Sequence, residues 1–355
     1  MRISRKDVEL NRRHCIVAGS AAAATLAARG AIAARPETIQ PDFQFHSNFW
    51  INLHHRLYRQ AQLLERMRYG REPVGFEKRI YADINRVAGD QRHTWETALA
   101  FYRAKYGRKD FIFDNDLRAT DDQLALTDNG RTPEALSLPK PLIAALMSTG
   151  PAYRTTFWKG DDSTNRVWIG AAKRSLATYG MHFSSALPRI FQSHWMSLPY
   201  RVDVMPDSSF PSSYSTYGGG GPLQPYWHIV VSSADPDNGG LGDMETLFHE
   251  ASHSIVWQDG GPVGSVVSRA AKRAGRPEPP DLWHVVIFYT VGSLAHAMYR
   301  RRGLAYTMFA VRAGLFKRFW PSYYAPLARY WQPYMDGKGT FEPALTKCVD
   351  AIVGV

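Results

Sequence analysis

Apolar residues recur at helical spacing over much of the segment from residue 43 to residue 192. Between residues 43 and 106 this repeat predicts helices, because its apolar members fall on one helix face. Those members are Phe49, Leu53, Leu57 and Leu64. Residues 110–131 are acidic and turn-rich but lack the spacing and central glycine of a calcium loop, so we expect a solvated loop and a helix start. Helical patterns resume over residues 141–146 and 166–192.

The pattern changes after residue 195, where three short runs are typical of strands. They are residues 200–205 (YRVDVM), 213–217 (SYSTY) and 227–232 (WHIVVS). Asp243 can then cap a helix that is predicted to run to about Gln258, before Gly260 and Gly261. The fold class is therefore predicted to be α+β and predominantly α-helical, with a small β-sheet before this helix and helical regions on both sides.

The helix after the strands contains the segment LFHEASHSIVWQ (residues 247–258) and has two distinct faces. One face is a continuous apolar stripe at intervals of three and four residues. Its members are Met244, Leu247, Phe248, Ala251 and Ile255. The other face presents His249, Glu250 and His253, so the histidines are not members of the packing stripe.

His249 and His253 lie one helical turn apart, with Glu250 directly after the first histidine. The His-Glu-x-x-His pattern is expected by chance only about 0.01 times in a chain of this composition, so chance is a poor explanation. Two imidazoles at this spacing converge on one Zn²⁺ ion, and a catalytic zinc keeps one position open for water. Glu250 lies beside a ligand without being one, so it is the candidate general base that accepts a proton from the activated water.

A small sheet whose last strands lead directly into an HExxH helix resembles the catalytic half of zinc metallopeptidases of the zincin group. The resemblance covers roughly residues 195–300, and only HExxH within it is a sharp motif. It implies a zincin-like catalytic core with a small mixed β-sheet, in which an edge strand pairs with the backbone of a bound peptide. Residues 213–217 are the best candidate for that strand.

The branches of the zincin group differ in the position of the third metal ligand. The metzincin pattern continues HExxHxxGxxH, but Val256 replaces its glycine and Asp259 stands where its last histidine belongs. That branch is disfavoured, although Asp259 stays open as an oxygen ligand. The gluzincin branch instead takes a glutamate from a second helix that packs beside the first.

A suitable second helix is predicted over residues 282–302, after two prolines and Asp281. It contains no glutamate, but it contains His284, with 30 residues between this histidine and His253. His284 shares its helix face with apolar residues, so either a metal ligand or an ordinary buried histidine fits. We take His284 as the best candidate for the third ligand, with Asp281 and Glu278 as rivals.

Other polar residues have weaker assignments. Candidates for stabilising the oxyanion are Tyr214, Tyr217, His228 and Tyr289, and the sequence does not choose among them. His54 and His55 are adjacent, so they point about 100° apart on a helix and suit a core or groove-lining role better than joint ligation of one metal. His296 lies about 120° around its helix from His284, so the two could not share a metal without distortion.

The first 33 residues have the features of an export signal, with a basic start, an alanine-rich apolar run and a small-residue cleavage site at residues 31–33. The Arg12-Arg13 pair before this run resembles a bacterial twin-arginine signal, although Cys15 stands where a bulky apolar residue is usual. A periplasmic or secreted protein is therefore expected. The run is too short to cross a bilayer and no later stretch approaches about 20 apolar residues, so the mature protein is expected to have no membrane span.

Charge and cysteine content add little to this picture. The net charge of the 355 residues is +11, and removal of the signal would lower it to about +7. We interpret this as a solvated surface and expect no nucleic-acid partner. Removal of the signal would also leave Cys348 alone, so no intramolecular disulfide is expected.

The sequence thus predicts an export signal (1–33), a mainly helical region (34–194) and a catalytic core with carboxy-terminal helices (195–355), the last two forming one continuous unit. The predicted function is that of a zinc metallopeptidase with one Zn²⁺ ion and a peptide or protein substrate. Two alternatives stay open: a non-catalytic metal-binding or wall-binding envelope protein, and a zinc amidase that acts on non-peptide bonds.

Overall fold

The computed structural model describes residues 40–74, 77–111, 113–207, 212–216, 225–256 and 261–354. These residues belong to one compact unit. The predicted export signal lies outside the described residues, as do Tyr217, Trp257 and Asp259. Among the helices of the described ranges, none is long and apolar enough to cross a membrane.

Helices make up most of the structure. Before the sheet they are α2 (Phe49–Arg68), α3 (Glu77–Ile84), α4 (Gln91–Tyr106), α5 (Asn115–Ala125), α6 (Lys140–Tyr153) and α7 (Lys159–Phe191). After the sheet they are α8 (Gly242–Ser252), α9 (Pro262–Arg273), α10 (Leu282–Arg300), α11 (Phe309–Arg312), α12 (Leu315–Phe319), α13 (Tyr324–Pro326), α14 (Gln332–Met335) and α15 (Phe341–Val353). Shorter helical turns are η1 (Leu126–Asn129), η2 (Pro133–Ala135), η3 (Arg154–Trp158), η4 (Pro236–Asn238) and η5 (Leu327–Trp331).

The described strands form one mixed sheet in the order β1-β2-β4-β3. They are β1 (Phe43–His46), β2 (Tyr200–Met205), β3 (Ser213–Ser215) and β4 (Trp227–Ser232). The first three strands in this order are parallel, whereas β3 runs antiparallel to β4 at one edge of the sheet. The α+β class and the small mixed sheet are therefore confirmed, and the bounds predicted for β2 and β4 are correct.

The prediction that helix begins at about Phe43 was wrong. Residues 43–46 form β1, which pairs in parallel with β2 from Phe43 opposite Tyr200 to His46 opposite Asp203. The alternating sequence FQFH is too short to be distinguished from the start of the helix that follows it, and the partner strand lies more than 150 residues away.

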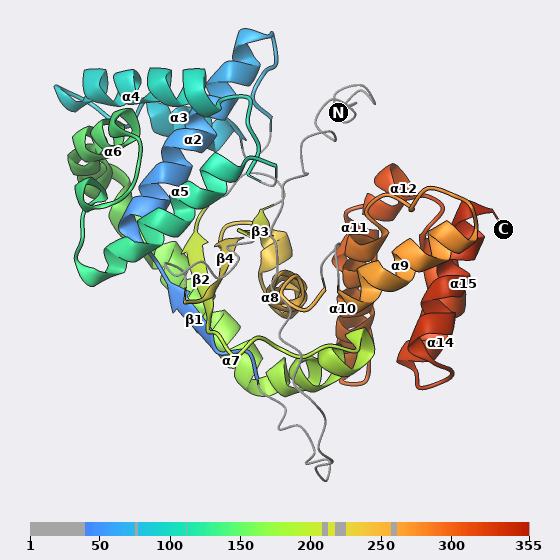
Figure 1. Cartoon of the computed structure of the whole chain (residues 1–355). Coiled ribbons are helices and arrows are strands. Elements are labelled where there is room, and N and C mark those ends of the chain that lie inside the picture. The colour runs from blue at the N-terminus through green and yellow to red at the C-terminus, as the bar shows by residue number, and fades with distance from the viewer. Residues whose placement is uncertain are drawn as a thin grey trace, which may run out of the picture. The chain divides into compact units, whose positions relative to one another are not determined.

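The sheet separates two hydrophobic cores because alternate side chains of each strand point to opposite faces. Tyr200, Val202 and Val204 of β2 pack in the core that contains α7, α8 and α10. On the opposite face, Met205 and Val230 pack with α2, α4, α5 and α6. Figure 1 shows these two groups of helices on either side of the sheet. Each core is therefore built largely from its own part of the chain, with the sheet common to both.

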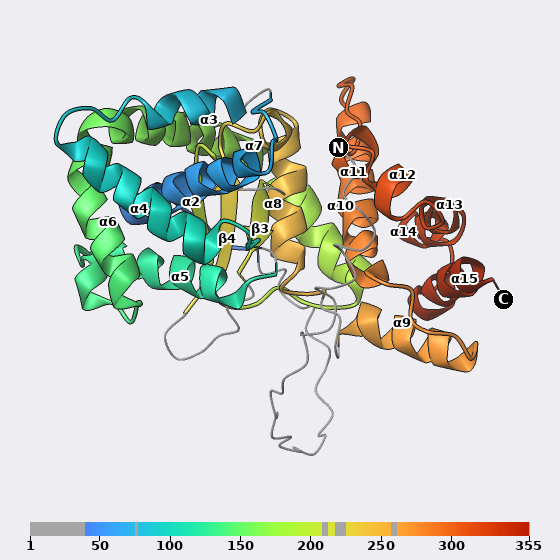
Figure 2. The same ribbon diagram turned by 90° about the horizontal axis from the view of Figure 1, so that it is seen from above.

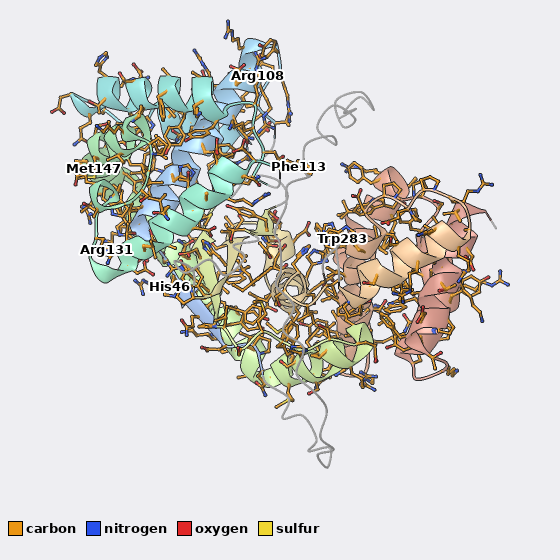
Figure 3. All side chains as sticks on the ribbon, in the orientation of Figure 1. His46, Arg108, Phe113, Arg131, Met147 and Trp283 are labelled. Atoms are coloured by element: carbon orange, nitrogen blue, oxygen red, sulfur yellow. The ribbon has the colours of Figure 1, made fainter. Side chains whose placement is uncertain are left out.

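A network of ion pairs, buried at Asp203 and His228 and partly exposed at Asp128 and His46, involves the polar side chains of β2 and β4. His228 lies between Asp203 (2.9 Å) and Asp122 (2.8 Å), and Arg201 bonds both Asp203 and Asp128. Asp128 also lies 2.6 Å from His46, which Figure 3 labels near the end of β1. The acidic segment 110–131 is thus not simply solvated, contrary to expectation, because its aspartates neutralise the basic side chains of the sheet.

Because of this network, we expect the free energy of unfolding to fall at alkaline pH. Burial opposes a charged imidazole, but the hydrogen bonds that it donates to Asp122 and Asp203 outweigh this effect and raise the pKa of His228 to about 9. The unfolded histidine has a pKa of about 6.5, so the stabilisation is complete below that pH and is lost as the pH rises to 9. We expect His228→Gln to lower the free energy of unfolding by about 3 kcal/mol at pH 6, where the imidazole is charged in both states.

Urea denaturation at pH 6 and pH 9 measures this effect. The difference in unfolding free energy between wild type and His228→Gln should shrink at pH 9. Equal differences at the two pH values would show that His228 is not charged in the folded protein.

Candidate metal centre

Helix α8 carries the HExxH residues between the sheet and α10. Its apolar stripe is completely buried, and Phe248 stacks on Phe183 of α7 with ring centroids 4.8 Å apart. The second face is also buried, since His249, Glu250 and His253 are only 4–6% exposed. Polar side chains buried to this degree need partners. The contacts of these three side chains therefore indicate the role of this helix face.

The helix is shorter than predicted. It ends at Ser252 and not near Gln258, so His253 is the residue that caps its carboxyl end. The Ser252 hydroxyl group donates to the Phe248 carbonyl oxygen, and the Ser254 hydroxyl group donates to that of Ala251. Such side-chain hydrogen bonds compete with the backbone bonds that would continue the helix. His253 keeps helical backbone angles (φ −58°, ψ −26°), which preserves its spacing from His249.

Helix α10 lies beside α8 and brings in the second element of the site (Figure 2). Gly292 allows this close approach, because a Cβ atom there would lie 2.9 Å from Glu245 Oε1 and 2.7 Å from Met308 Cβ. Glu245 of α8 accepts hydrogen bonds from Tyr306 Oη (2.6 Å) and from the backbone N–H of Phe309. These hydrogen bonds of Glu245 thus connect α8 to the segment that follows α10.

The imidazoles of His249, His253 and His284 meet between the two helices. One possible ligand atom from each lies within 4.8 Å of the others, and the Nε2 atoms of His249 and His284 are 3.2 Å apart. Two nitrogen ligands of a tetrahedral zinc lie about 3.3 Å apart, given Zn–N distances of about 2.0–2.1 Å. One pair of nitrogen atoms therefore has the spacing of zinc ligands, and the three side chains together are close enough to hold a metal ion.

The protonation state of these histidines also suits a metal. Burial, followed by the charge of neighbouring imidazoles, holds the pKa values of His249 and His253 well below the ordinary value. Burial alone lowers the pKa of His284 to about 4. All three are neutral at pH 7, and the neutral imidazole is the form that binds metal ions.

Glu250 lies next to this group with both carboxylate oxygens engaged. Ser213 Oγ donates to Oε1 and Ser215 Oγ donates to Oε2, each over 3.0 Å. Its Oε2 atom lies 3.9 Å from His253 Nε2. Burial raises the pKa of Glu250 to about 7, and the two serine hydrogen bonds oppose that shift. A carboxyl group whose pKa lies near neutrality is suited to taking up and releasing a proton.

Aromatic rings enclose the histidines from the side of α10. The ring of Phe288 lies 4.1 Å from that of His249, and Trp283 lies 5.7 Å from His253. Trp320 lies 6.4 Å from His284 and 5.9 Å from Phe288. In Figure 3, Trp283 is labelled where α10 faces α8. Trp283, Phe288 and Trp320 are partly exposed, so they form an apolar rim beside the three imidazoles.

Comparisons with protein-family models, with curated proteins and with solved structures found no match for this chain.

The rival ligands do not join the three imidazoles. Asp281 and Glu278 are both exposed, and neither belongs to the metal-sized group found among the described residues. Asp259 lies outside those residues. His296 instead bonds the carbonyl oxygen of Tyr306 through Nδ1 at 2.6 Å. His284 is thus the candidate third ligand that the structure brings to the pair on α8.

Most of the oxyanion candidates point elsewhere. Tyr214 bonds Asp121 in the core on the far face of the sheet, and His228 is held by Asp122 and Asp203 on that same face. Tyr289 is buried against Tyr324, and Tyr217 is outside the described residues. None of the described candidates contacts the three imidazoles.

His54 and His55 also lie in the far core. His54 Nδ1 is 2.8 Å from Tyr102 Oη, and His55 Nε2 is 3.2 Å from Asp121 Oδ2. The core role predicted for this pair agrees with these contacts.

Two features of the site were missed from the sequence. The alternation of the segment SYS places Ser213 and Ser215 on one strand face, but it does not say that this face meets Glu250. The position of Phe288, one turn after His284, was visible on the helix wheel, but its contact with His249 depends on how α10 packs. Both contacts join residues more than 30 positions apart in the chain, where local patterns carry no information.

Proposed function

We propose that this chain is a zinc-dependent hydrolase, most simply a metallopeptidase, with His249, His253 and His284 as metal ligands and Glu250 as general base. The observation that carries the proposal is the group of three imidazoles, two buried and one partly buried, beside a buried carboxylate that is not part of the group. A structural zinc would tend to have a fourth protein ligand, whereas three ligands leave a position for water. The proposed arrangement is similar to that of gluzincins, with a histidine in place of the third-ligand glutamate.

The chain's own residues account for the proton transfers of hydrolysis. When bound, zinc would lower the pKa of a water molecule and polarise the carbonyl group under attack. Glu250 takes one proton as the water oxygen bonds to the carbonyl carbon, and it gives that proton to the nitrogen as the C–N bond breaks. The serines hold its carboxylate in place, and the aromatic rim restricts water on the α10 side.

An extended peptide is the substrate that the surroundings favour. β3 is an edge strand, and its residues Ser213 and Ser215 bond Glu250, so a peptide pairing along that edge would run beside the general base. The predicted export signal would place the activity in the periplasm or outside the cell.

The proposal is tested with purified mature protein and a defined peptide mixture. We expect about one zinc per chain by elemental mass spectrometry, cleavage of some peptides by chromatography and mass spectrometry, loss of cleavage after chelation, and recovery with Zn²⁺. A zinc-loaded protein that cleaves no peptide but releases amide-linked groups from cell-wall fragments would be an amidase. Inactivity on both substrates would favour the non-catalytic envelope protein.

A further inference from the structure

We propose that β3 positions the general base: Ser213 and Ser215 orient the Glu250 carboxylate, while Tyr214 anchors the strand on the opposite face of the sheet. This inference rests on the proposed function, because the orientation of Glu250 matters for turnover only if Glu250 transfers a proton. It assigns a role to three consecutive residues and to a buried polar cluster that the hydrolytic mechanism does not otherwise use.

The serine contacts restrict the carboxylate at both of its oxygens. Ser213 Oγ donates to Oε1, and Ser215 Oγ lies within hydrogen-bond distance of both Oε2 (3.0 Å) and the Glu250 carbonyl oxygen (2.9 Å). With one hydroxyl group beside each oxygen, rotation of the carboxylate plane is restricted, although the single Ser215 proton is shared between Oε2 and the carbonyl oxygen. Two serines at positions i and i+2 can do this because they share one face of the strand.

Tyr214 lies between the serines and points into the opposite core. Its hydroxyl group donates to Asp121 Oδ2 at 2.5 Å, and its ring stacks on Phe111 with centroids 5.2 Å apart. His55 Nε2 lies 3.1 Å from the same hydroxyl group and 3.2 Å from Asp121 Oδ2. Tyr214, Asp121 and His55 are 0–4% exposed. A short edge strand is thus anchored to α2 and α5 by a fully buried cluster.

The start of β3 is held as well. Ser212, the residue before the strand, has a φ of 74°, in the left-handed region that non-glycine residues seldom adopt. Its carbonyl oxygen accepts hydrogen bonds from the N–H of Ser232 (2.7 Å) and from Asn238 Nδ2 (3.1 Å). These bonds stabilise an otherwise unfavourable backbone conformation and set the register in which Ser213 meets Glu250.

The expected effect follows from the sensitivity of proton transfer to geometry. A displacement of about 1 Å at a reacting group can lower the rate about 100-fold. Loss of one serine hydroxyl leaves one oxygen of Glu250 without its donor, so we expect kcat to fall about 10-fold or more with little change in KM. Loss of the Tyr214 hydroxyl group affects Glu250 only indirectly, through the position of β3, so kcat should fall by a smaller factor.

The test uses two replacements at Ser215 that are isosteric with each other. Threonine keeps a hydroxyl group and valine has the same shape without one, so any crowding is common to both variants. We expect Ser215→Val to lose kcat and Ser215→Thr to retain most of it, with equal zinc content. Tyr214→Phe, which keeps the stacking ring, is the second variant if the buried methyl group prevents folding. Equal activity of the Thr and Val variants, or wild-type kcat in Tyr214→Phe, would overturn the inference.

A binding measurement separates this inference from the proposed function. Acetohydroxamic acid would bind zinc as the hydroxamate anion while a neighbouring base takes up its proton, so its affinity reports on Glu250 without turnover. By calorimetry on zinc-loaded protein we expect weaker binding in Glu250→Gln and in Ser215→Val but not in Ser215→Thr. That result, combined with no peptide cleavage, would support the positioning role of the serines and contradict the proposed metallopeptidase activity. Equal hydroxamate affinity of Ser215→Val and Ser215→Thr would contradict the positioning role.

Discussion

Glu250→Gln is expected to lower kcat by about 10²- to 10⁴-fold while the protein keeps one zinc per chain. The amide has the size of the carboxylate, and its oxygen can still accept a hydrogen bond from one of the serines, but it cannot take a proton. Zinc should stay bound because Glu250 lies outside the group of three imidazoles. The measurement is kcat on a cleaved peptide together with metal analysis of the same sample.

Glu245→Gln is the matched control for this prediction. Glu245 is another buried carboxylate of α8, with a pKa that burial raises to about 7, but its partners are Tyr306 and the backbone of Phe309. The glutamine oxygen can accept the same bonds, so this variant should keep both zinc and turnover. Full activity in Glu250→Gln would contradict the mechanism, and loss of zinc in that variant would make Glu250 a ligand.

His284→Ala is expected to weaken zinc binding by more than about 100-fold. Loss of an outer partner of a metal ligand already costs about 10- to 100-fold in affinity, and loss of a ligand should cost more. His249 and His253 alone would leave the ion with two protein ligands. Competition with a chromogenic chelator measures the affinity of each variant without any assay of activity.

The controls for His284 come from its own region of the chain. His296→Ala removes another imidazole of α10, one that bonds the Tyr306 carbonyl group, so zinc affinity should stay at the wild-type value. Asp281→Asn and Glu278→Gln should also keep zinc, since both side chains are exposed. Retention of zinc in His284→Ala with loss in either of these carboxylate variants would show that the third ligand was assigned wrongly.

Predictions that depend on local patterns held best in this chain. The strands at residues 200–205 and 227–232 were found because each alternates or continues apolar residues between turn signals, and both have the predicted bounds. The helix after residue 281 was found from its proline pair and its apolar periodicity, and it begins at Leu282. The apolar stripe of α8 was also predicted correctly, since all five of its members are fully buried.

Predictions failed where distant contacts override local preference. Residues 43–46 form a strand because β2 provides a pairing partner, not because of their own sequence. The aspartates of residues 121–128 are drawn into pairs with the basic residues His55, Arg201 and His228. An acidic, turn-rich segment is usually solvated, but here the sheet presents buried positive charges that need neutralising.

The sequence by itself determined the helix that carries His249, Glu250 and His253, because the spacing of one turn and the apolar stripe are properties of a single helix. Only the tertiary structure decided that His284 reaches the same point, that Ser213 and Ser215 bond Glu250, and that Tyr214 does not enter the site. These pairings depend on how α10 and β3 pack against α8, and packing depends on side-chain shape and charge across the whole core. Periodicity gives the face on which a residue lies, whereas packing decides what that face meets.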